Sequence, residues 1–157
     1  MGRLKSGPER ELVERYRQRI EGLGRNLGFT GLDIVEFPES RARREDDRRA
    51  EEAAAISDRA GDSALIVFDE RGKSPTSDAF AGRIRQWRDD GMAGLACVIG
   101  GPDGLDPQIL QHAKLVVSFG ALTMPHQIVR ALVAEQLYRA LTIIAGHPSH
   151  RAGHDDS

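Results

Sequence analysis

The period of the apolar positions changes several times along the chain, and each change predicts a new element. Between Pro8 and about Arg25, apolar residues recur at helical spacing among charged ones, which predicts an amphipathic helix: Leu12, Val13, Tyr16, Ile20 and Leu23. The stretch GLDIVEF alternates apolar and polar residues and ends at Pro38, so we expect a strand. After Ser40, a candidate N-cap, strong helix formers with few large apolar residues predict a further helix.

Three short continuous apolar runs follow: SALIVFD, GLACVIG and KLVVSFG. Such runs are typical of strands that are buried on both faces of a parallel sheet. A helix from about Asp78 to Asp90, with Phe80, Ile84 and Trp87 on one side, and a short helix around PQILQHA separate them. The alternation of strands and helices predicts an α/β fold, with a parallel sheet covered by helices on both faces.

The last helix follows Pro125, whose fixed φ suits a first helical turn. Its apolar stripe indicates a packing element: Ile128, Val129, Leu132, Val133, Leu137, Leu141 and Ile144. Glu135 and Arg139 are four residues apart, so we expect a helix-surface ion pair between them.

Composition limits the class of protein. At 157 residues with 39% hydrophobic and 29% charged content, the chain suits one globular domain. It has no apolar run of roughly 18 residues for a membrane helix and no signal-peptide core, so we expect a cytoplasmic protein. The net charge of -2 gives no overall basic field, so nucleic-acid binding would depend on a local patch or on shape.

Several chemical groups suggest no site of their own. The single Cys97 lies among apolar residues and is expected to be a buried, unreactive thiol. The histidines form no zinc pattern with it, so no metal is expected. One charge cluster favours a solvated face, with an arm that touches phosphates as the alternative: Arg41, Arg43, Arg44, Arg48 and Arg49, interrupted by three acidic residues.

Ligands of open parallel sheets bind in the loops beyond the carboxyl ends of the strands. Three such loops stand out: DERGKS after Phe68, GGPDGL after Ile99 and GALTMP after Phe119. Taken alone, GGPDGL also fits an ordinary tight turn. It lacks the spacing of a dinucleotide fingerprint and of a P-loop, so phosphate-cradling ATPase chemistry is not expected.

His126 and Arg130 lie on the opening turns of the last helix. A cation at a helix N-terminus opposes the helix macrodipole. Two interpretations stay open at this point: a solvated first turn, or cations placed there for function.

Several of these stretches together resemble one family. VIGGPDGL and LVVSFGALTMPHQIVRALVAEQLYRALTIIAGHPSHR, supported by GRLKSGPE and FDERGK, are similar to the ribosomal large-subunit methyltransferase H family, the pseudouridine N3-methyltransferases. The resemblance covers nearly the whole chain to Arg151. It departs at Ser149, where relatives usually have tyrosine, and at the start, where relatives carry a short apolar strand before the first helix that this sequence lacks.

The resemblance implies a SPOUT fold with a C-terminal trefoil knot, in a single domain over residues 1–151 followed by a polar tail over 152–157. It also implies a homodimer that uses S-adenosylmethionine to methylate N3 of a pseudouridine in helix 69 of 23S rRNA, within the assembled ribosome. The alternative is a non-catalytic RNA- or ribosome-binding module that keeps the knotted fold.

Carried over residue by residue, the resemblance also implies the site. The cofactor residues are Phe68, Gly100, Phe119, Gly120, Ala121, Leu122, Thr123 and Met124, with Leu122 and Met124 flanking the adenine. The polar groups that face the RNA or the reacting base are His126, Arg130, His150 and Arg151. Our hypothesis is that Arg130 or Arg151 supplies a positive field and that His126 or His150 positions or accepts the N3 proton.

Overall fold

A computed structural model describes residues 7–29, 31–36, 51, 54–56, 61, 63–92, 94–99, 107–122 and 124–146. Within these ranges four strands and four helices are bounded as follows: α1 Pro8–Asn26, β1 Gly31–Glu36, β2 Ala64–Lys73, α3 Ser77–Asp89, β3 Gly94–Ile99, α4 Pro107–His112, β4 Leu115–Val117 and α5 His126–Ala145. The strands form a sheet in the order β1-β3-β2-β4, and every pairing is parallel. The predicted α/β class with a parallel sheet is confirmed.

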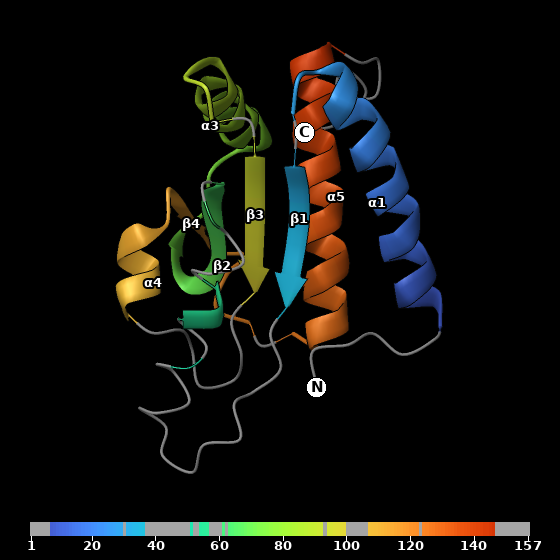
Figure 1. Cartoon of the computed structure of the whole chain (residues 1–157). Coiled ribbons are helices and arrows are strands. Elements are labelled where there is room, and N and C mark those ends of the chain that lie inside the picture. Colours follow the sequence, from blue (N-terminus) through green and yellow to red (C-terminus); the bar gives the residue numbers. More distant parts are fainter. Residues whose placement is uncertain are drawn as a thin grey trace.

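Alternate residues of the central strands face opposite sides of the sheet, as the pleat requires. On one face, Ile66 of β2 and Cys97 of β3 join a core with α1, α3 and α5. On the other face, Val67 and Val98 join a smaller core that includes Ile109 of α4. Both faces of the sheet are therefore covered by helices (Figure 1).

The longest helices lie side by side. α1 runs along α5 in Figure 1, and α3 also packs against α5. The predicted apolar side of α3 is confirmed, because Phe80, Ile84 and Trp87 are all buried. In α5, Leu137 and Leu141 are buried as expected, but Ile128 is 41% exposed. The predicted apolar stripe of α5 is thus wider than the face of the helix that is buried. Small residues such as Ala134 form part of that buried face.

The edge between β2 and β4 departs from a simple strand pair. Val117 pairs with both Phe68 and Lys73, so the chain between these two residues leaves the register and returns to β4. A Cβ on Gly72 would lie 2.5 Å from the carbonyl oxygen of Val116, so only glycine allows this approach. β2 is consequently longer than the predicted strand, and β4 is shorter.

The ends of α5 show how the chain enters and leaves it. Pro125 has an extended ψ of 143° and caps the helix from outside, so it does not occupy the first turn as predicted. Gly146 ends the helix in the left-handed conformation, with a φ of 69°.

The helix predicted after Ser40 and its arginine cluster lie almost wholly outside the described residues, and the trefoil knot stays a prediction.

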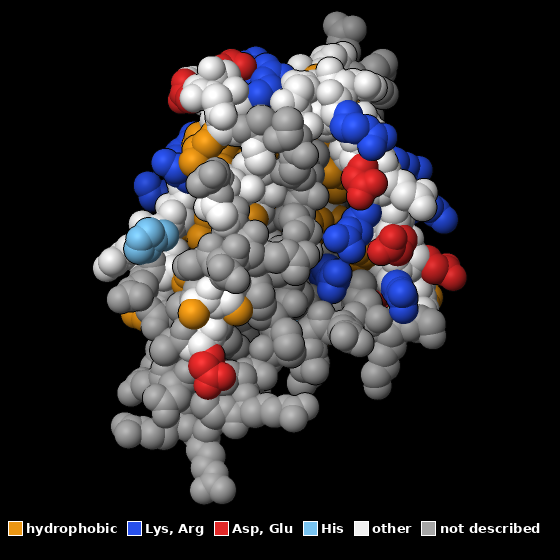
Figure 2. Space-filling view, viewed as in Figure 1, with side chains coloured by type: hydrophobic (Ala, Val, Ile, Leu, Met, Phe, Trp, Pro, Cys, Tyr) orange, Lys and Arg blue, Asp and Glu red, His pale blue; other side chains and the backbone are white. Residues whose placement is uncertain are grey.

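Charges of both signs are mixed on the visible face of α1, where blue and red side chains alternate in Figure 2. The predicted ion pair of α5 is confirmed, with Arg139 Nη2 at 2.7 Å from Glu135 Oε2. Cys97 is fully buried, as expected. None of the helices in the described ranges is both long and apolar enough to cross a membrane.

Candidate active site

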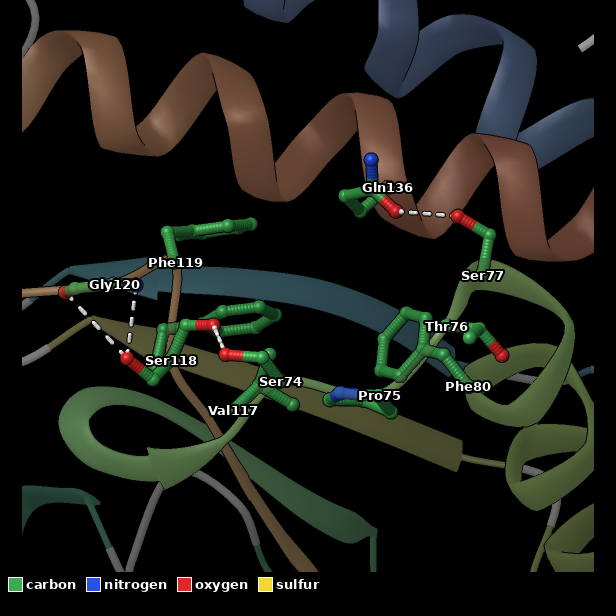
Figure 3. A pocket seen from close by; sticks show the side chains of 11 residues that line it. Ser74, Pro75, Thr76, Ser77, Phe80, Val117, Ser118, Phe119, Gly120 and Gln136 are labelled. Carbon is green, nitrogen blue, oxygen red and sulfur yellow. Dashed lines mark hydrogen bonds between the residues drawn. The ribbon is translucent and has the colours of Figure 1, made fainter. Parts of the chain in front are cut away.

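A pocket of about 430 Å³ opens between α5, the start of α3 and the C-terminal end of β4. Figure 3 shows it beneath α5. Its size is within the range of about 300–1,000 Å³ that small-molecule sites occupy. Eleven described residues line it: Phe68, Ser74, Pro75, Thr76, Ser77, Phe80, Val117, Ser118, Phe119, Gly120 and Gln136.

One end of the pocket is aromatic. The rings of Phe68 and Phe119 are stacked, with centroids 5.4 Å apart and an interplanar angle of 15°. Phe68 is buried and Phe119 only partly so. The chain turns away directly after them, because Gly120 has a φ of +110° and donates its N–H to Ser118 Oγ at 2.9 Å. An aromatic surface beside a glycine backbone suits a flat ligand.

The floor of the pocket is fixed by the loop that follows β2. Ser74 Oγ donates a hydrogen bond to the Ser118 carbonyl at 2.8 Å, and the Ser118 N–H donates to the Lys73 carbonyl at 2.7 Å. These bonds join the end of the predicted loop DERGKS to Ser118, two residues before the predicted loop GALTMP.

The other end of the pocket combines the Phe80 ring with polar, uncharged side chains. Thr76 caps α3 by accepting the Ala79 N–H at 3.1 Å. Ser77 Oγ donates to Gln136 Oε1 at 3.3 Å, and Gln136 Nε2 donates to Glu135 Oε1 at 2.9 Å. The Gln136 amide is therefore held in one orientation by two neighbours.

A charged pair lies in the last part of β2, after Phe68. Arg71 donates from Nε to Asp69 Oδ1 and from Nη2 to Asp69 Oδ2, both at 2.9 Å. The hydrogen bond from the Arg71 side chain holds the pKa of Asp69 below its usual value, although burial acts in the opposite direction. The pair ties together the part of β2 that precedes Gly72.

The structure brings together three of the predicted cofactor residues, since Phe68, Phe119 and Gly120 all line the pocket. Ala121 and Leu122 are exposed, Leu122 by 85%, and Met124 is partly exposed; none of these three lines it. The remaining two cofactor residues lie outside the described residues: Gly100 and Thr123.

His126 and Arg130 sit on the first two turns of α5. Both are partly buried, and the Nδ1 atom of His126 and the Nε atom of Arg130 are shielded from solvent. This burial differs from the solvated first turn that was one of the two interpretations. Neither residue lines the pocket, and His150 and Arg151 lie outside the described residues.

Sequence reasoning missed part of the pocket lining. It marked the loop DERGKS but not Ser77 or Phe80, and it treated Gln136 only as part of a helix. The helical spacing of α5 places Gln136 beside the buried apolar stripe and not within it. This spacing does not identify the hydrogen-bond partner of Gln136, Ser77, which is 59 residues away in the sequence. Among the described residues, no group of three or more His, Cys, Asp or Glu side chains is arranged to hold a metal ion.

Comparison with known proteins shows the family. Residues 1–150 match the family model described as a predicted SPOUT methyltransferase. The chain is 60% identical to the ribosomal RNA large subunit methyltransferase H of Bradyrhizobium sp. (strain ORS 278), over 97% of this chain and 94% of that protein. It is 58% identical to the protein of that name from Rhodopseudomonas palustris (strain HaA2), over 97% of this chain and 96% of that protein.

A third relative with that name, from Methylobacterium nodulans, is 57% identical over 96% of this chain and 94% of its own length. Among solved structures, a probable methyltransferase from Bordetella pertussis Tohama I aligns with a TM-score of 0.45 and 16% identity, over 80% of this chain and 88% of that one. The family model and the relatives at 57–60% identity agree along almost the entire sequence. The chain belongs to the SPOUT methyltransferase family.

Proposed function

We propose that this protein methylates large-subunit ribosomal RNA with S-adenosylmethionine as the methyl donor. The observation that carries the proposal is the 57–60% identity, over nearly the full length, to relatives named ribosomal RNA large subunit methyltransferase H. The more specific target is N3 of a pseudouridine in helix 69 of 23S rRNA, in the assembled ribosome, and the active form is a homodimer.

The described residues fit such a donor. An adenosine moiety needs an apolar surface for its ring and close main-chain approach, and Phe119 and Gly120 offer both at one end of the pocket. When bound, S-adenosylmethionine supplies a methyl group on a positively charged sulfur. The protein contributes by binding this group, aligning the target nitrogen with it and excluding water.

The remaining chemical step is removal of the N3 proton. That proton is weakly acidic, so a nearby cation favours its loss by stabilising the anion that forms. Arg130 is positioned on the second turn of α5, with its Nε shielded from solvent, where its field is less screened than on an open surface. We assign the positive field to Arg130 or Arg151, and the positioning or acceptance of the proton to His126 or His150.

The test is transfer of labelled methyl groups to ribosomes that lack the modification, with free 23S rRNA and separated subunits as comparisons. We expect methylation of assembled ribosomes and much slower methylation of naked rRNA. Equal rates on both would contradict recognition of the assembled particle. Failure to methylate any of them, with ribosome binding intact, would support a non-catalytic binding module instead.

The assigned cation is tested by Arg130→Ala. Loss of one group that stabilises developing charge lowers kcat by about 10²-fold or more. Arg85→Ala is the matched control, because Arg85 is exposed on α3 and does not line the pocket. A rate for Arg130→Ala equal to that of the control would remove Arg130 from the mechanism.

A further inference from the structure

Ser118 lies where β4 has ended and the chain turns into the predicted cofactor residues. The resemblance assigns a role to Phe119 and Gly120, which follow it, and none to Ser118 itself. Ser118 is only 8% exposed, and it lines the pocket. Its N–H, its carbonyl and its hydroxyl all form hydrogen bonds, and Figure 3 shows those of the carbonyl and the hydroxyl. The backbone around this residue is therefore fixed from three sides.

The hydroxyl group of Ser118 holds Gly120. Ser118 Oγ accepts the Gly120 N–H at 2.9 Å, and the same oxygen lies 3.5 Å from the Gly120 carbonyl oxygen. Gly120 has a φ of +110°, and a Cβ added there would meet no described atom within 4 Å. Packing by the described atoms thus does not explain why the turn has this shape. The bond to Ser118 does, because it joins a backbone N–H to a buried side chain two residues earlier.

The backbone of Ser118 ties the same turn to the chain that follows Phe68. Its carbonyl accepts Ser74 Oγ at 2.8 Å, and its N–H donates to the Lys73 carbonyl at 2.7 Å. Ser74 is 44 residues earlier in the sequence and also lines the pocket. The turn at Gly120 can therefore move only if bonds to a distant segment break.

These bonds determine what the turn offers a ligand. The Gly120 N–H is already used by Ser118, so a ligand in the pocket meets Gly120 mainly through its shape and its carbonyl. A loop that already has its binding conformation loses less conformational freedom when the ligand arrives, and affinity rises for that reason. Ser118 is thus placed to act on the ligand through Gly120.

We propose that Ser118 is a positioning residue for the methyl donor, which holds Phe119 and Gly120 in the binding conformation before the donor arrives, while Ser74 holds Ser118 from the other segment. This inference rests on the proposed function. Because both serines act through the shape of the turn, their loss should weaken binding of the donor and leave the methyl-transfer step of the bound complex largely intact.

The test combines calorimetry with kinetics on ribosomes. The calorimetric ligand is S-adenosylhomocysteine, which is the methyl donor after it has lost its methyl group. Ser118→Ala removes the hydroxyl, so affinity should fall by about tenfold, the effect of one lost hydrogen bond. The KM for the methyl donor should rise by a similar factor, while kcat changes by less than about threefold. A fall in kcat with unchanged affinity would overturn the proposal.

Ser74 allows a test by rescue, because its side chain lies at an exposed position where substitution disturbs folding little. Ser74→Ala removes the bond to the Ser118 carbonyl and should lower affinity by about threefold to tenfold. Ser74→Thr keeps a hydroxyl and should restore most of that loss. Equal losses in the two variants would show that the hydroxyl does not hold the turn.

Two measurements separate positioning from a general effect on folding. Thr142→Val is the matched control, because Thr142 is 2% exposed, donates from Oγ1 to the Arg139 carbonyl at 2.7 Å and does not line the pocket. Its affinity for S-adenosylhomocysteine should equal that of wild type. Hydrogen exchange of the Gly120 amide should be slow in ligand-free wild type and fast in Ser118→Ala. Fast exchange in the ligand-free wild type would overturn the proposal, since the turn would not be held in advance.

The outcomes distinguish this inference from the function on which it rests. If wild-type protein binds S-adenosylhomocysteine and methylates ribosomes, but Ser118→Ala binds it equally well, the role of Ser118 is wrong and the proposed function stands. If wild-type protein neither binds S-adenosylhomocysteine nor transfers a methyl group, both are wrong.

Discussion

The substitution Gly72→Ala tests how closely β2 and β4 are joined. A Cβ at this position would lie 2.5 Å from the Val116 oxygen, 2.6 Å from the Val116 carbonyl carbon and 2.8 Å from the Val117 nitrogen. All three are backbone atoms, so no side chain can rotate to relieve the contact. Either the end of β2 around Gly72 or β4 must therefore move away from the other.

Overpacking of this kind typically costs about 1–3 kcal/mol. The displacement also weakens the hydrogen bonds that join Ser118 to Lys73 and Ser74, each worth about 0.5–1.5 kcal/mol net. We therefore expect the free energy of unfolding to fall by about 2–4 kcal/mol. Because these bonds form the floor of the pocket, binding of S-adenosylhomocysteine should weaken as well.

The assay is urea unfolding at one fixed protein concentration, so that self-association does not alter the comparison. Gly82→Ala is the matched control, because a Cβ at Gly82 in α3 would meet nothing within 4 Å. Replacing this helical glycine should stabilise the protein by up to about 1 kcal/mol. If the free energy of unfolding of Gly72→Ala were within about 0.5 kcal/mol of the wild-type value, the close approach of Gly72 to β4 would be wrong.

Three further changes probe other contacts. Asp69→Asn removes a carboxylate whose pKa is lowered by Arg71. A lowered pKa stabilises the fold at pH values above the unfolded pKa of about 3.9. In urea unfolding from pH 3 to 7, the difference in unfolding free energy between wild type and variant should therefore be full near pH 7 and shrink as the pH falls below about 4. A gap that does not change with pH would contradict the pairing. Arg88→Ala removes a 2.9 Å hydrogen bond to the Leu27 carbonyl and the contact with the Phe29 ring. The free energy of unfolding should fall by about 2 kcal/mol. For Arg85→Ala, at an exposed position, it should fall by less than about 0.5 kcal/mol. Thr76→Ala removes the cap of α3 and should cost about 1 kcal/mol, whereas Thr76→Ser should keep the cap and most of that energy.

Local pattern was sufficient to predict much of the fold. The apolar run at β3 and the spacing of Phe80, Ile84 and Trp87 each predicted an element that the structure contains, because burial on one or both faces leaves a period in the sequence. The extension of β2 to Lys73 was not predicted. Its cause is a pairing with Val117, 44 residues further along, and no local period records such a contact.

The candidate site was predicted less completely for the same reason. Phe68, Phe119 and Gly120 were identified through the resemblance, and the structure places them in one pocket. Gln136 was missed because its environment depends on where α3 begins relative to α5. Composition also could not show that His126 and Arg130 are partly buried, since burial depends on tertiary contacts that composition does not record.

The single thiol of the chain lies in the most protected part of the sheet. Cys97 is fully buried in β3 and is paired on its two sides with Ile34 of β1 and Ile66 of β2. A thiol reagent can reach it only when the central strands separate, because reaction needs an accessible thiolate. The rate of alkylation of this residue therefore reports opening of the sheet without any engineered probe, and a ligand that stabilises the folded state should slow it in proportion to its occupancy.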